Sequence, residues 1–142
     1  MLDLETPIVS RLEAALGDSA RVLTATSLQQ LQDGRMAMAP AVFVLYLRGT
    51  PSLADAWELV QIRQRWWAVV MARHADATGR GARGSAGVLA RQVFDALAGW
   101  TPEGASRPLL LADMPRADYL SGGVLLPLEF ETEIELTMAP GE

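Results

Sequence analysis

The chain has 142 residues, half of them hydrophobic, which is enough for one domain that buries its own core. It contains no cysteine, so disulfides and thiolate metal sites are excluded. The net charge of −5, with arginine as the only basic residue apart from one histidine, argues against a surface that grips a nucleic acid backbone. The longest apolar run, residues 39–47, is about half the ~20 residues of a membrane helix. We therefore expect a single domain over residues 1–142 and no membrane partner.

Short elements are predicted before residue 40. Thr6, a following proline and an apolar stripe predict a helix over residues 7–16 that Thr6 caps and Gly17 ends. Residues 21–25 are typical of a short strand, and a brief helical turn is expected over residues 26–31.

A long β-hairpin is predicted in the middle of the chain. Residues 41–47 are rich in β-branched and aromatic side chains and are followed by Gly49, which indicates a buried strand. Residues 57–73 form a second extended run, apolar along one face and polar on the first half of the other. Because this strand exceeds the usual length, we expect a bend or bulge near Arg65-Trp66. The hairpin should be antiparallel, with a projecting tip and a buried base.

The C-terminal half predicts one helix and two strands. A flexible connection is expected up to Gly84, after which Ser85 caps an amphipathic helix that ends at Gly99 and packs on the sheet. Residues 109–111 are a short strand candidate, and the chain from Val124 alternates between apolar and acidic residues, as a half-buried strand does. The predicted fold class is α/β of the α+β type, with a largely antiparallel or mixed sheet, a long hairpin and two main helices.

A glycine-rich segment matches a nucleotide-binding motif. Residues 79–84 read G-x-G-x-x-G between a strand and a helix, which is the order that a dinucleotide-binding turn requires. The preceding strands form a hairpin instead of a parallel βαβ unit, and the acid at the expected offset, Glu103, falls in a turn. A small nucleotide-binding enzyme is therefore the less favoured alternative to a flexible, arginine-bearing loop.

Two further patterns suggest catalysis only weakly. Ser85 lies in a sequence one glycine short of the nucleophile elbow, and His74 is the only histidine that could serve as its base. Glu129 and Glu131, two apart on one strand face, match the spacing of an inverting glycosidase, but a general acid needs an apolar pocket. We expect no catalytic residue, cofactor or metal.

The acidic face of the last strand has two other interpretations. It could repel a nucleic acid that slides past it, or pair across strands with Arg63 and Arg65. Its members are Glu129, Glu131, Glu133 and Glu135.

Four tryptophans could suggest base stacking. Single-strand binders, however, combine aromatic residues with a basic groove, and the net charge of this chain is acidic. The adjacent Trp66 and Trp67 must point to opposite faces of an extended strand. One should fill the core, and the other should pack under a helix or against a neighbouring subunit.

The order of these elements resembles that of a viral structural family. The matching stretches are Pro40-Ala41-Val42-Phe43-Val44, Trp67 to Arg73, and Gly87 to Leu89 through Gly99-Trp100-Thr101-Pro102. These stretches follow an N-terminal helix and precede a strand of alternating apolar and acidic residues. In this order of elements, the chain resembles the tail terminator, or tail-completion, proteins of long-tailed bacteriophages. The likeness is one of pattern and order over nearly the whole chain, without a catalytic motif.

The resemblance implies a structural protein that forms a hexameric ring on the last ring of the tail tube, ends tube polymerisation and offers a head-tail joining surface. The implied partners are copies of itself, the tail tube protein, a head-tail connector protein and passing DNA that is not bound specifically. The implied location is the head-proximal end of the tail in the virion, with assembly in the host cytoplasm. Another ring-forming tail or neck protein, such as a connector component or tube subunit, remains an alternative.

Under this interpretation, two groups of side chains are candidates for assembly. The acidic residues Glu129 to Glu135 would line the channel. The possible subunit or ring contacts are Arg63, Arg65, Trp67, Arg80 and Arg83.

Overall fold

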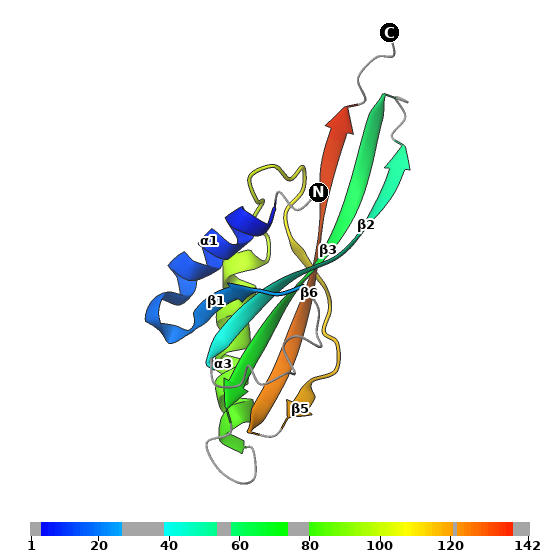
Figure 1. Ribbon diagram of the computed structural model, residues 1–142. Helices are drawn as coiled ribbons and strands as arrows, with labels where there is room; N and C mark the ends of the chain where they lie inside the picture. The colour runs from blue at the N-terminus through cyan, green and yellow to red at the C-terminus, as the bar shows by residue number, and fades with distance from the viewer. Residues whose placement is uncertain (1–3, 27–38, 54–57, 74–79, 121, 138–142) are drawn as a thin grey trace.

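The computed structural model describes residues 4–26, 39–53, 58–73, 80–120 and 122–137. Within these ranges, two α-helices pack on one face of a six-stranded sheet (Figure 1). The helices are α1 (Glu5–Leu16) and α3 (Arg80–Leu97), with a 3-10 turn η1 (Gly17–Ser19) after the first. The strands are β1 (Arg21–Thr24), β2 (Ala41–Leu53), β3 (Leu59–Arg73), β4 (Leu110–Asp113), β5 (Asp118–Leu120) and β6 (Gly123–Thr137).

The sheet is mixed. Its order is β1-β2-β3-β6-β4, and β5 pairs with β6 beyond the end of β4. β1 runs parallel to β2, whereas every other neighbouring pair in the described sheet is antiparallel. The predicted α+β fold, with its antiparallel hairpin and two main helices, is therefore confirmed.

Helix α1 begins two residues earlier than predicted. Leu4 occupies the N-cap position without a side-chain cap, so the prediction that Thr6 caps the helix is wrong. The proline at the third helical position is tolerated because the first N–H groups of a helix have no partner inside it. The helix ends at Leu16, as predicted, where Gly17 takes a positive φ of 52°.

Helix α3 also begins earlier than predicted. The backbone is helical from Arg80, so Ser85 lies inside the helix and is not its cap. The expected loop over residues 79–84 is likewise wrong for residues 80–84, and Gly79 lies outside the described residues. The three glycines of α3, Gly81, Gly84 and Gly87, cost the helix about 1 kcal/mol each, which the arginine and alanine residues of the helix and its packed apolar stripe offset. The G-x-G-x-x-G segment thus follows an antiparallel strand and does not form a tight turn at a helix N-terminus.

The hairpin is longer than its sequence signals suggested. β2 continues past Gly49 to Leu53, which pairs with Val60, so the predicted end near residue 47 is wrong. The irregularity expected near Arg65-Trp66 lies opposite them, as a register shift in β2 between Tyr46 and Arg48. Gly49 permits the strand to continue because its missing Cβ leaves space for the Tyr46 side chain.

The sheet has a buried cluster on each face. The larger cluster lies under α1 and α3 and includes Trp66, which is 2% exposed. The smaller cluster, on the other face of the base, surrounds Phe43, Val69 and Met71, with Trp67 packed against it. The prediction that the two tryptophans point to opposite faces is therefore confirmed.

The two ends of the segment between α3 and β4 are joined by backbone hydrogen bonds. The Gly99 N–H donates to the Leu109 carbonyl, and the Leu109 N–H donates to the Trp100 carbonyl. β4 then begins at Leu110, one residue later than predicted, and the sequence analysis missed β5. The predicted turn over residues 26–31 lies outside the described residues, except for Thr26.

Candidate assembly surface

Beyond the irregularity in β2, three strands continue as a projecting arm, defined here as residues 48–53, 59–65 and 131–137. Figure 1 shows this arm extending past the helices. Its strands alternate between two kinds of side chain, so one face is charged and the other is apolar. Most of the predicted contact residues lie on or beside the charged face.

The charged face is built by the register between β3 and β6. Gln61, Arg63, Arg65 and Trp67 lie opposite Glu135, Glu133, Glu131 and Glu129, in that order. Because these residues alternate with buried ones on both strands, the arginines and glutamates must share one side of the sheet. We call this set the arginine-glutamate ladder. The cross-strand pairing expected for Arg63 and Arg65 is present, whereas the position of this face relative to a passing nucleic acid stays a prediction.

Glu129 is the most buried member of the ladder, with 8% of its surface exposed. Its Oε2 accepts a hydrogen bond of 2.7 Å from Arg65 Nη1, and its Oε1 accepts one of 2.7 Å from Trp67 Nε1. A buried carboxylate is stable only when it is paired and hydrogen bonded, and these two donors meet that requirement. The Trp67 indole is thereby held by a hydrogen bond within the same chain.

The ladder becomes more exposed toward the tip of the arm. Arg63 Nε lies 2.9 Å from Glu131 Oε1, and Arg65 Nε lies 3.7 Å from the same oxygen. Arg107, in the connection before β4, reaches Glu133 at 3.7 Å. Glu135 is exposed and has no ion pair in the described structure. The carboxylates are thus progressively less neutralised from base to tip.

The opposite face of the arm is apolar. Leu53, Val60 and Leu136 form one row across the three strands, next to a row that contains Ile62 and Ile134. Leu53 is 67% exposed and Leu136 is 45% exposed, whereas Ile62 and Ile134 are buried. Exposed apolar side chains gathered at a projecting tip are typical of a protein contact.

The structure does not bring all the predicted contact residues together. Arg63, Arg65 and Trp67 share the ladder, but Arg80 and Arg83 belong to the first turn of α3, which Figure 1 places at the end of the molecule opposite the arm tip. The side chains of these two arginines lie outside the described part of the structure. Sequence reasoning missed Arg48 and Leu53, although polar and apolar residues also alternate through residues 48–53.

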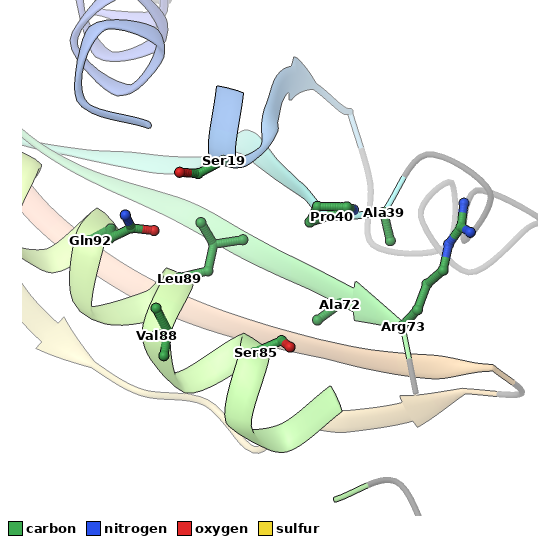
Figure 2. A pocket seen from close by; sticks show the side chains of 9 residues that line it. All are labelled: Ser19, Ala39, Pro40, Ala72, Arg73, Ser85, Val88, Leu89 and Gln92. Atoms are coloured by element: carbon green, nitrogen blue, oxygen red, sulfur yellow. The ribbon is translucent and has the colours of Figure 1, made fainter. Parts of the chain in front are cut away.

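A cavity of ≈ 840 Å³ lies at the base, between α3, the two residues that precede β2 and the end of β3 (Figure 2). Ser85 lines it from within a helix, not from a strand-to-helix turn, so the nucleophile-elbow geometry is absent. His74, the proposed base, lies outside the described residues. The residues that line the cavity are Ser19, Ala39, Pro40, Ala72, Arg73, Ser85, Val88, Leu89 and Gln92.

Other site chemistries find no support among the residues described. No group of three or more His, Cys, Asp or Glu side chains in this part of the chain could hold a metal ion. Glu129 and Glu131 both contact arginine, so neither occupies the apolar pocket that a glycosidase acid needs. No described helix has both the length and the apolar character to span a membrane.

Comparisons with known proteins give a family match and a similar solved structure. A family model described as phage tail terminator protein matches residues 1–140. A chain in the solved virion of a native gene transfer agent (GTA) particle has a similar fold, with a TM-score of 0.61 and 17% sequence identity. That match covers 94% of this chain and 95% of the other. No curated protein matches the sequence significantly.

Proposed function

The chain belongs to the phage tail terminator family, and from this premise we propose that it forms a hexameric ring that caps the tail tube. The cap ends tube polymerisation and provides the surface for head-tail joining. The mechanism is one of shape: one ring face copies the interface that the tube offers, and the other does not accept another tube ring. Binding without bond chemistry is sufficient for this role.

The projecting arm is the observation that supports this proposal most directly. It holds an exposed apolar row at its tip, with Leu53 and Leu136 partly uncovered, next to a ladder of paired charges. Burial of apolar surface drives most protein association, and aligned ion pairs fix its geometry. We assign to the arm the contact with an adjacent subunit or ring.

The ladder is also the face that we place toward the channel. Arg48, Arg63 and Arg65 accompany the four glutamates from Glu129 to Glu135, so positive and negative charges nearly balance on it. A nearly neutral face neither holds a DNA backbone nor strongly repels it, which suits a duplex that must pass through. An experimental ring structure with these carboxylates on its outer surface would end this assignment.

Arg80 and Arg83 are proposed to contact the tube or the connector from the other end of the subunit. Their replacement by alanine together should reduce ring formation or docking, because two cations would be removed from one helical turn. Rings and particles in wild-type numbers with the double variant would exclude this helix start from the contact.

Deletion of the gene from its phage or prophage tests the function itself. Negative-stain electron microscopy of the induced lysate should show overlong tubes without heads. Tails of normal length detached from heads would indicate a connector instead, and a lack of tubes would indicate a tube subunit. Intact, infectious particles would contradict a structural role in the tail. Complementation with the wild-type gene is the control.

A further inference from the structure

Both edges of the arm are open among the residues that the structure describes. β1 pairs with β2 only up to Val44, which also accepts a hydrogen bond from Ala25, so no described strand lies beside the outer edge of β2 from Leu45 onward. On the other side, β4 covers β6 at residues 129–131, and Ser106 donates to the Glu133 carbonyl. Beyond Glu133, β6 is also an outer strand. Unpaired edges of this kind are templates for another strand.

The charges on the two edges are complementary. Arg48 lies opposite Arg65 in the register, and Arg65 is directed toward Glu129 and Glu131. Arg48 itself is exposed and has no carboxylate partner in the described structure, and like charges on neighbouring strands repel each other. At the opposite edge, Glu135 is exposed and also unpaired. The ladder therefore ends in an unpaired cation at the β2 edge and an unpaired anion at the β6 edge.

We propose that copies of this chain join edge to edge through the arm, with the β2 edge of one copy beside the β6 edge of the next. Arg48 then completes the ladder of the neighbouring copy through the glutamates of β6. The contact uses two different surfaces of each copy, so it is heterologous and closes into a ring when the rotation per copy allows. This inference rests on the proposed ring function and specifies how the copies meet.

The strand directions agree with such a contact. β2 and β6 are each antiparallel to β3, so they run the same way, and copies related by rotation about an axis along the arm would place them in parallel. Because Arg48 is level with Glu131 in the register, a stagger of about four residues between the copies, as strands tilted to a ring axis produce, brings Arg48 beside Glu135 on the open part of β6. Pro51 has no N–H, so the β2 edge offers donors over only part of its length, which limits the registers available.

Charge reversal tests the contact without disturbing the fold. Arg48→Glu places an acid beside Arg65, and Glu135→Arg faces the neutral Gln61, so both variants should fold normally. Sedimentation velocity of the purified full chain should show an association constant about tenfold or more lower for each single variant. The double variant should regain association. Glu13→Arg, which makes the same charge change on exposed α1, is the control and should associate like the wild type.

Thiol cross-linking tests which edges meet. The chain has no cysteine, so Thr50→Cys on β2, next to Arg48 on the same face, and Glu135→Cys on β6 each introduce a single thiol. With a short bifunctional thiol reagent, the two variants mixed should give cross-linked dimers that neither gives alone. Cross-links in one variant alone would overturn the arrangement, as would a wild-type oligomer that survives both charge reversals. A wild-type chain that never associates, or thiol variants that never cross-link, would overturn the edge contact. The gene deletion tests the cap function independently of this result.

Discussion

Arg65 and Glu129 are joined diagonally across the sheet: Arg65 Nη1 lies 2.7 Å from Glu129 Oε2, although the register places Glu131 directly opposite Arg65. The directly opposite neighbour of Glu129 is Trp67, whose indole N–H occupies the other carboxylate oxygen. The diagonal pair therefore lies where the arm joins the buried base. It links the charged ladder to the core of the subunit.

We expect Glu129→Gln to destabilise the protein by about 1–3 kcal/mol, because a hydrogen-bonded charge partner of the half-buried Arg65 is lost. Urea unfolding measures this change. Glu135→Gln is the matched control: its carboxylate is exposed and unpaired in the described structure, so its effect should stay within about 0.5 kcal/mol. Equal effects of the two substitutions would contradict a structural role for the Glu129 pairings.

Gly49→Ala should destabilise the arm by about 1–3 kcal/mol, because overpacking forces neighbours to move. The added Cβ would lie 2.7 Å from the Tyr46 hydroxyl oxygen and 2.9 Å from Ile62 Cγ2. The Tyr46 ring packs edge-on against Trp66 at 5.2 Å, which restricts its movement. Thermal or urea unfolding gives the change in stability.

The opposite sign is expected for Gly87→Ala. Gly87 lies within α3, and nothing lies within 4 Å of the added Cβ. Replacement of a helical glycine by alanine should stabilise the protein by about 0.5–1 kcal/mol. Destabilisation by both glycine substitutions would show that local packing at Gly49 is not the cause of its effect.

Arg11 links the two helices, because its Nε donates to the Ala96 carbonyl at 2.9 Å and its guanidinium lies 5.2 Å from the centre of the Trp100 ring. The Ala96 carbonyl belongs to the last turn of α3, where carbonyls lack partners inside the helix. Arg11→Ala should therefore lower stability by about 0.5–1.5 kcal/mol, measured as a lower urea midpoint. Arg11→Lys keeps the positive charge but not the planar guanidinium donor. A wild-type urea midpoint for this variant would show that the charge alone accounts for the contribution of Arg11 to stability.

Leu53→Ser should separate assembly from folding. Leu53 is 67% exposed at the arm tip, so its truncation should change unfolding by no more than about 0.5 kcal/mol. Ring formation, or complementation of the gene deletion, should nevertheless fall, because an apolar contact side chain becomes polar. Val88→Ser on α3, where the side chain is 65% exposed, is the comparison. Unimpaired assembly by the Leu53 variant would exclude the tip from the contact.

The sequence by itself determined the strands in which side chains alternate regularly between two kinds. The alternation in residues 60–72 and 124–136 placed Trp66 and Trp67 on opposite faces, and the structure agrees. A two-residue period fixes faces, because successive side chains in a strand point to opposite sides. Helix starts were predicted less well. Thr6 and Ser85 are good caps in isolation, but both helices begin before them, and at α1 the buried Leu4 and Ile8 show that packing on the sheet includes the first turn.

Strand partners and strand ends were decided by the tertiary structure. Gly49 and Pro51 are local signals for a turn, yet pairing with β3 carries β2 through to Leu53 because the neighbouring strand supplies its hydrogen bonds. The sequence determined that Glu129 to Glu135 share a face and that arginines alternate on another strand. Only the register, which arises from contacts between distant segments, determined that Arg65 meets Glu129 and that Arg48 and Glu135 are left at opposite edges.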